Sequence, residues 1–199
     1  MHLLSLVLPA LLLTISAPAA DVPAFRVSGS PNAPVTLEVY TDFQCPHCRE
    51  FYLVVLPQLR TEFIDTGKVR FIHRDFRISQ FQFSKLAARY ANAAGEVGKY
   101  DAVCDRLFET QPEWSHSGNV DAEVAKVLSP AEMEKVREKV KNDPRLEDQT
   151  LKDEEMARDV DHIAATPTVV IIVKGKREPV SGAVNFTLLK SYINEKLGK

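Results

Sequence analysis

The sequence predicts an α/β protein in which a β-α-β unit and a later β-β-α unit build one sheet, with an all-helical insertion between them. Residues 35–40 are apolar and rich in β-branched and aromatic side chains, which predicts a buried strand. A helical pattern over 45–65 and a second strand pattern at 69–73 follow, and a connection of this length implies a parallel, right-handed β-α-β unit. The strongest strand pattern, 168–173, comes only after a long helical tract, so the two halves of the sheet are separated in sequence.

The first half of the chain carries clear boundary signals. The lead-in at 25–34 contains Gly29, Pro31 and Pro34 and is expected to be a loop. The helix expected from Cys45 to about Asp65 contains Pro57, which removes a backbone hydrogen bond and predicts a kink or break there. Gly67 then supplies a left-handed cap before the next strand.

The helical insertion is expected to cover about residues 80–161 and to hold about four helices. Ser129, Pro130 and Glu132 form the signature of a capped helix start. The segment from Asp143-Pro144 to about Val160 is rich in charged residues, which we interpret as a solvated helix face.

The β pattern returns near the end of the chain. Residues 168–173 and 178–181 flank a Lys-Gly-Lys turn and predict a hairpin. Asn185 is in position to cap a last helix. Because both halves are needed to complete one sheet, residues 21–199 are expected to form a single domain.

The first twenty residues differ from the rest and predict a secretion signal. They contain no Lys, Arg, Asp or Glu, residues 3–15 are apolar, and Ala17-Pro18-Ala19 has the small-x-small pattern that precedes a signal-peptidase cut. We therefore expect residues 1–20 to be a signal peptide and the protein to be periplasmic or secreted. An uncleaved anchor is the alternative, so the sequence leaves open whether the mature protein is soluble or tethered.

The composition and net charge of the chain indicate which classes of partner to expect. Hydrophobic residues make up 45% and charged residues 26%, and the formal net charge is −2. This balance gives no reason to expect nucleic acid or an anionic membrane as a partner.

The motif Cys45-Pro46-His47-Cys48 joins the first strand to the first helix and carries the chemistry. The free N–H groups at a helix start favour an anion, so Cys45 is expected to be stabilised as a thiolate. His47 is expected to add to this field, whereas Pro46 shapes the turn. The other readings of the pair are a structural disulfide or half of a zinc site, although zinc needs four ligands. The third cysteine, Cys104, is expected to be a buried free thiol, with a second redox role or an intermolecular bridge as alternatives.

The chain resembles the DsbA-like thiol:disulfide oxidoreductases, which have a thioredoxin fold with a helical insertion. The residues that carry the resemblance are spread over nearly all of the mature chain: Asn32-Ala33-Pro34-Val35-Thr36, Asp42 to Cys48, His73-Arg74-Asp75-Phe76, Leu107-Phe108, Gln111, Trp114 and Ala165-Thr166-Pro167-Thr168. The resemblance implies that Cys45 is the exposed nucleophile, Cys48 the buried resolving thiol and Pro167 a cis-proline beside them. Backbone groups of Thr166 are then expected to pair with an extended substrate peptide.

One position departs from the family pattern. Many relatives place a buried acid six residues before the first cysteine, where this chain has Val39. The neighbouring Glu38 is expected to point to the opposite face of the strand, which makes it a poor proton relay for Cys48. The relay is then a water, or there is none.

The function expected from the resemblance is extracytoplasmic thiol–disulfide exchange. The enzyme would donate the Cys45–Cys48 disulfide, through a mixed disulfide, to exported proteins with free thiols, and a membrane or periplasmic redox partner would reset it. We expect no cofactor or metal beyond this pair, and a monomer. The alternatives are a periplasmic reductase or isomerase, and a non-redox peptide-binding holdase whose disulfide is structural.

Overall fold

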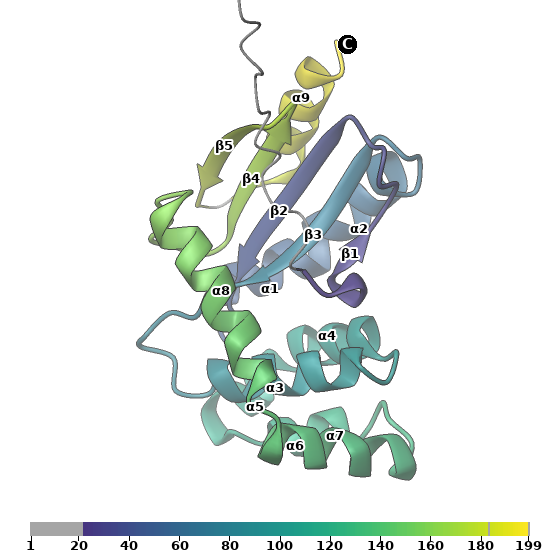
Figure 1. Cartoon of the computed structure of the whole chain (residues 1–199), viewed down its shortest axis with the longest axis vertical. Helices are drawn as coiled ribbons and strands as arrows, with labels where there is room; N and C mark the ends of the chain where they lie inside the picture. The colour runs from purple at the N-terminus through teal and green to yellow at the C-terminus, as the bar shows by residue number, and fades with distance from the viewer. Residues whose placement is uncertain (1–21, 183, 199) are drawn as a thin grey trace, which may run out of the picture.

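A computed structural model describes residues 22–182 and 184–198, and its centre is a mixed five-stranded sheet in the order β1-β3-β2-β4-β5 (Figure 1). The strands are β1 (Val27–Ser28), β2 (Val35–Thr41), β3 (Val69–Asp75), β4 (Thr168–Val173) and β5 (Lys176–Ser181). Strands β2 and β3 are parallel, and the other neighbouring pairs are antiparallel. The predicted β-α-β and β-β-α units therefore share one sheet, which confirms the expected fold class.

The helices fall into two groups, those of the sheet-forming halves and those inserted between β3 and β4. The first group is α1 (Pro46–Glu50), α2 (Leu56–Leu59) and α9 (Phe186–Lys196). The inserted group is α3 (Ser84–Gly95), α4 (Tyr100–Glu109), α5 (Gln111–Ser117), α6 (Val120–Val124), α7 (Pro130–Asn142) and α8 (Arg145–Asp159). The predicted signal peptide lies outside the described residues.

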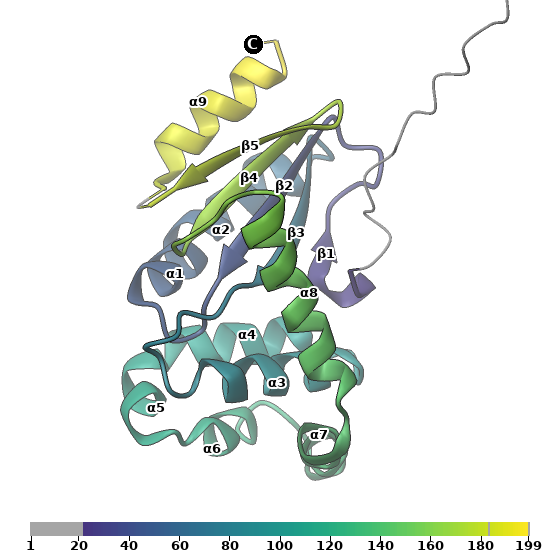
Figure 2. The same ribbon diagram turned by 60° about the vertical axis from the view of Figure 1, so that its left-hand side comes forward.

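The arrangement of these helices gives the sheet two different faces. Helices α1, α2 and α9 cover one face, and α8 runs along the other (Figures 1 and 2). Helices α3 to α7 lie together beyond the carboxyl ends of β2 and β3, next to α1 (Figure 2). The start of α1 is therefore enclosed between the sheet and the insertion.

The long helical segment after the cysteine motif differs from the expectation in one respect. The chain stays helical from Pro46 to Ile64, with α1 and α2 each followed by a wider π-type turn, at Phe51–Val55 and Arg60–Ile64. Pro57 occupies the first turn of α2 and does not end the helical path. Proline has no backbone N–H to donate. The wider π-type turn beside it shifts the register of the helical hydrogen bonds, so the helix continues instead of breaking.

Other predicted boundaries also needed correction. The lead-in is not only loop, because a short 3₁₀ turn at Ala24–Arg26 runs into β1, which pairs with β3. Helix α5 was not predicted, since Trp114 is its only large apolar residue and the segment has no helical periodicity. The caps at Ser129 and Asn185 are confirmed, each accepting a hydrogen bond from a backbone N–H in the first turn of its helix.

Successive side chains of β2 point to opposite faces of the sheet and pack into two different apolar clusters. Val35, Leu37 and Val39 belong to the main apolar core, together with Cys45 and Cys48. Tyr40 belongs to a smaller cluster on the other face, which Ala157 of α8 also joins. The dithiol thus lies on the α1 side of the sheet.

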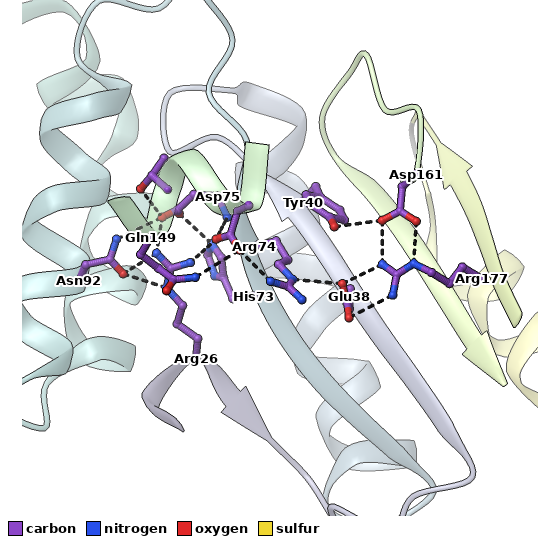
Figure 3. Close-up of polar contacts among 12 residues, drawn as sticks. Arg26, Glu38, Tyr40, His73, Arg74, Asp75, Asn92, Gln149, Asp161 and Arg177 are labelled. Carbon is purple, nitrogen blue, oxygen red and sulfur yellow. Dashed lines mark hydrogen bonds and ion pairs between the residues drawn. The ribbon is translucent and has the colours of Figure 1, made fainter. Parts of the chain in front are cut away.

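The opposite face holds a chain of buried ionic contacts (Figure 3). Arg74 bonds both Glu38, at 3.0 Å, and Asp153, at 2.8 Å, and Arg26 also bonds Asp153. Arg177 donates to Glu38 at 2.9 Å and to Asp161 at 2.7 Å, and the Tyr40 hydroxyl donates to the same Asp161 at 3.0 Å. These bonds tie the lead-in, the central strands, the hairpin and α8 together. The prediction of a solvated charged face on the segment that forms α8 is therefore wrong for Asp153 and Glu154, which are buried and paired with arginines of the sheet side.

Candidate active site

The cysteine motif begins where β2 ends. Residues 42–45 form the turn, the backbone N–H of Cys45 donates to the carbonyl oxygen of Asp42 at 3.1 Å, and Cys45 is the N-cap residue of α1. Pro46 is the first residue of α1, where its missing N–H leaves no helical bond unmade. The local sequence thus places Cys45 at the entrance of the helix and Cys48 one turn inside it.

The two sulfurs have different surroundings. Cys45 keeps 6% of its surface exposed, whereas Cys48 is fully buried, and both are free thiols in this structure. The backbone N–H of Asp42 donates to Sγ of Cys48 at 3.4 Å. Sγ of Cys45 lies 3.5 Å from the carbonyl oxygen of Thr166. The resemblance implied an exposed Cys45, but in this structure both cysteines are buried and Cys45 is only the less buried of the two.

These surroundings separate the acidities of the two thiols. A hydrogen bond from the Cys48 thiol, aided by Thr166 and by the backbone N–H groups of Cys48 and His47, lowers the pKa of Cys45 to about 5. Burial, together with the hydrogen bond to Cys45 and its charge, raises the pKa of Cys48 well above the ordinary range. At neutral pH the pair therefore holds one thiolate, on Cys45, and one thiol, on Cys48.

The predicted substrate-binding residues lie next to the dithiol. The Thr166–Pro167 peptide bond is cis, as the resemblance implies, and it directly precedes β4. Since β4 pairs with β2, the Thr166 carbonyl is carried to the end of the strand from which the cysteine turn departs. The roles of these residues in binding a substrate remain predictions.

A groove of about 470 Å³ opens beside the cysteine motif. Its walls come from the first helical segment, from the cis-proline loop and from the start of α9: His47, Glu50, Phe51, Val54, Val55, Gln58, Pro167, Val184, Asn185, Phe186 and Thr187. Val54 is 55% exposed, which is unusual for a valine and leaves an apolar edge open to a partner. The groove is large enough for a short peptide segment.

The imidazole of His47 has a smaller part in the geometry than the sequence suggested. The side chain is exposed, and within residues 22–182 and 184–198 no hydrogen bond joins its ring to Cys45. The contribution of His47 to the Cys45 thiolate comes through its backbone N–H. The tuning role of the ring stays a prediction.

Glu38 behaves as its strand position predicted. It bonds Arg74 and Arg177 on the face away from the cysteines. Burial acts to raise the pKa of Glu38, but the hydrogen bonds and charges of the two arginines outweigh it and hold the pKa below its usual value. A carboxylate engaged in this way is unsuited to exchange protons with Cys48.

Polar side chains hold the cysteine turn against the insertion, a role that no sequence pattern predicted. The Gln111 amide donates to the carbonyl oxygens of Phe43, at 2.7 Å, and Cys45, at 3.1 Å. Gln44 accepts from the Phe83 N–H and donates to the Ser115 carbonyl. Gln111 was noted only for its part in the resemblance, and no local signal reveals a contact made 66 residues away.

Asp42 is a second residue whose role was missed. It is 2% exposed and lies in the turn three residues before Cys45. Burial raises the pKa of Asp42 to about 6, against the opposing effect of its hydrogen bonds to Ser84, Ile78 and Gln44, and the charge of Cys45 adds to the rise. An acidic residue directly after a buried strand and three residues before Cys-x-x-C was the available signal.

His73 and Cys104 have structural surroundings. His73 is buried, contacts Thr41 at 2.8 Å and stacks on Phe43, and burial lowers its pKa to about 4. Cys104 is fully buried and unpaired, as expected. Within the described residues, no group of three or more His, Cys, Asp or Glu side chains is placed to hold a metal ion. The same residues contain no helix with the length and apolarity needed to cross a membrane.

A sheet-and-helix scaffold that presents Cys-x-x-C at a helix start, next to a cis-proline, defines a dithiol protein of the thioredoxin class. A sequence model described as Thioredoxin matches residues 22–195, so the chain belongs to this family. The relatives confirm the DsbA-like branch. Disulfide bond formation protein D of Bacillus subtilis is 30% identical over 154 residues, covering 73% of this chain and 66% of the relative.

Solved structures agree with this placement. The oxidised form of BdbD from Bacillus subtilis has a TM-score of 0.72 and 26% identity, covering 87% of this chain and 93% of that one. Wolbachia pipientis alpha-DsbA1 has a TM-score of 0.71 at 21% identity, covering 87% and 90%, which supports the fold alone. The match covers about two-thirds of the length of the Bacillus relative. It covers 34% of the length of a putative protein-disulfide oxidoreductase of Rickettsia bellii.

Proposed function

We propose that this protein is an extracytoplasmic thiol:disulfide oxidoreductase that works as an oxidant. A client thiolate attacks Sγ of Cys45 in the Cys45–Cys48 disulfide, forming a mixed disulfide and releasing Cys48, which takes up a proton. A second client thiolate then attacks the client sulfur of the mixed disulfide. Cys45 leaves as a thiolate, so the client gains a disulfide and the pair gains two electrons.

The observation that carries this proposal is the unequal acidity of the two thiols. The pKa of Cys45, about 5, makes it a good leaving group in the second step and stabilises the reduced pair at neutral pH. When the reduced form is stabilised, the disulfide becomes a stronger oxidant. DsbA is the known example of this relation, so the relation is borrowed from DsbA-like proteins and is not new to this chain. Each tenfold stabilisation corresponds to about 30 mV.

The surroundings of Cys45 support a protein client. The groove beside the motif has an apolar edge and a polar rim, and the Thr166 carbonyl stands 3.5 Å from Sγ of Cys45. An extended peptide that pairs with the backbone at Thr166 would bring its own cysteine to this sulfur. Exported proteins with free thiols fit this site, and a membrane or periplasmic protein would have to reoxidise the pair.

The direction of electron flow is tested by equilibrating the protein with glutathione and by two parallel assays. We expect fast oxidation of a reduced, unfolded substrate, slow reduction of insulin, and a potential above that of the glutathione pool. Faster insulin reduction, with a potential below the pool, would identify a reductase. Cys45→Ser should abolish turnover, while Cys104→Ser, which alters a buried thiol outside the motif, should retain it.

The same variants test the non-redox alternative. A peptide-binding holdase would suppress aggregation of an unfolded client equally well with Cys45→Ser. Loss of disulfide transfer in that variant, with binding retained, supports the enzyme.

The proposed location rests on the predicted signal peptide and on the need of a disulfide donor for an oxidising compartment. Expression of the full chain in a bacterium, followed by fractionation and mass measurement, tests it. We expect a mature chain that starts near Ala20 or Asp21 in the extracytoplasmic fraction. An uncut chain in the cytoplasm would contradict the proposal.

A further inference from the structure

Asp42 is a buried carboxylate that lies beside the dithiol without a cation. Its oxygens accept hydrogen bonds from the backbone N–H groups of Gln44 and Ile78, both at 2.7 Å, and from Oγ of Ser84 at 2.6 Å. Among residues 22–182 and 184–198, no Lys, Arg or His side chain forms an ion pair with it. It is held as an anion by neutral donors only.

Other buried carboxylates of this protein are neutralised. Asp75 pairs with Arg26, and Asp153 pairs with both Arg26 and Arg74. A buried carboxylate without a counter-ion is costly, because desolvation is not repaid by a nearby positive charge. Its persistence in a site with a second titrating group points to a functional role.

The backbone of Asp42 ties it to both cysteines. Its N–H donates to Sγ of Cys48 at 3.4 Å, and its carbonyl oxygen accepts from the N–H of Cys45 at 3.1 Å. Its side chain reaches the other way, to the loop before α3 and to Ser84 at the start of that helix. The residue therefore joins the dithiol to the insertion.

We propose that Asp42 is a positioning residue of the dithiol, whose carboxylate opposes the charge of the Cys45 thiolate and so limits how strongly the reduced form is stabilised. This inference rests on the proposed redox function. The coupling is reciprocal by linkage. Formation of the disulfide removes the charge of Cys45, and Asp42 then ionises more readily.

The groups that surround Asp42 leave this coupling undisturbed near neutral pH. From β3, His73 is uncharged above pH 5, because burial lowers its pKa to about 4. The pKa of Cys48 is raised well above the ordinary range by burial, so this residue stays a thiol. The insertion faces Asp42 with the Ser84 hydroxyl and the Ile78 N–H, which do not titrate.

The first test removes the charge of Asp42 and keeps its shape. In Asp42→Asn we expect the equilibrium with glutathione at pH 8, where Asp42 and Cys45 are both charged in the parent dithiol form, to shift about tenfold toward the reduced protein, roughly 30 mV. Ser84→Ala is the matched control, because it removes a hydrogen bond to the carboxylate while Asp42 remains ionised at this pH. It should leave the glutathione equilibrium in place. An unchanged equilibrium in Asp42→Asn, or equal shifts in both variants, would overturn the proposal.

The second test needs no variant. A carboxyl-carbon NMR titration should find the midpoint of Asp42 near 6 in the dithiol form and lower in the disulfide form. Equal midpoints in the two forms would refute the coupling. Both tests are made without a client, so a protein that proves to be a reductase or a holdase can still show the coupling.

Discussion

Two regions of the molecule hold buried charge in opposite ways: the α8 face of the central sheet, and the cysteine turn at the carboxyl end of β2. On the α8 face, each carboxylate of the network bonds at least one arginine, and Glu38 bonds two (Figure 3). In the cysteine turn, the Cys45 thiolate and the Asp42 carboxylate meet only neutral hydrogen-bond donors. The arginines outweigh burial at Glu38 and Asp75 and hold the pKa of each below its usual value, whereas burial still raises the pKa of Asp153. Without a counter-ion, Asp42 has its pKa raised to about 6, and it lies beside the dithiol that we propose carries the redox chemistry.

The largest expected effect comes from breaking the paired side. Asp153→Ala leaves Arg26 and Arg74 without this carboxylate in the interior, and loss of one partner of a buried pair costs about 3–5 kcal/mol in free energy of unfolding. Denaturant unfolding measures it. Arg137→Ala, in an exposed pair with Asp121, is the control and should cost much less. Equal losses would show that the network is not the source of stability.

The pH dependence of stability tests the unpaired side. The folded pKa of Cys45, about 5, lies below the ordinary value of 9.0. The thiolate therefore contributes stability to the reduced protein that is complete above pH 9 and is lost as the pH falls from 9 to 5. The oxidised protein lacks this contribution. Unfolding of both forms should show the advantage of the reduced form shrinking over this range, whereas a constant difference would contradict the assignment.

A smaller effect is expected at the contact between the insertion and the cysteine turn. Gln111→Leu removes the donors to the carbonyl oxygens of Phe43 and Cys45, and unpaired buried groups cost about 1–3 kcal/mol. Urea unfolding gives the loss, and the alkylation rate of Cys45 reports any loosening of the turn. Asn142→Leu is the control, because it also replaces an amide side chain by leucine but at an exposed position of α7. A free energy of unfolding equal to that of the parent protein would show that the Gln111 hydrogen bonds do not stabilise the cysteine turn.

The smallest effect is expected for His47→Leu. The sequence predicts a less oxidising disulfide in this variant, since a ring that donates a hydrogen bond or carries a positive charge stabilises the thiolate. Because the ring is exposed and the backbone N–H of His47 is kept, we expect a change below tenfold in the glutathione equilibrium, or less than about 30 mV. An unchanged potential would show that the ring does not tune the site, and a larger change would mean that it contacts Cys45 in solution.

Short-range patterns were read correctly because short-range physics produces them. The alternation of β2, the caps at Ser129 and Asn185, and the position of Cys45 at a helix start each depend on residues within a few places of one another. The register shift around Pro57 was not predicted, since proline admits either a kink or a wider turn and packing selects between them.

The sequence by itself determined the order of the elements, the cysteine motif at the start of a helix and the resemblance to the DsbA-like family. Only the tertiary structure decided which polar residues meet. Ser84 reaches Asp42 across 42 positions, Gln111 reaches Cys45 across 66 and Arg26 reaches Asp153 across 127. Such contacts leave no periodic trace in the chain, because they arise when separately formed elements pack. The charge balance around Cys45 therefore became visible only in the folded protein.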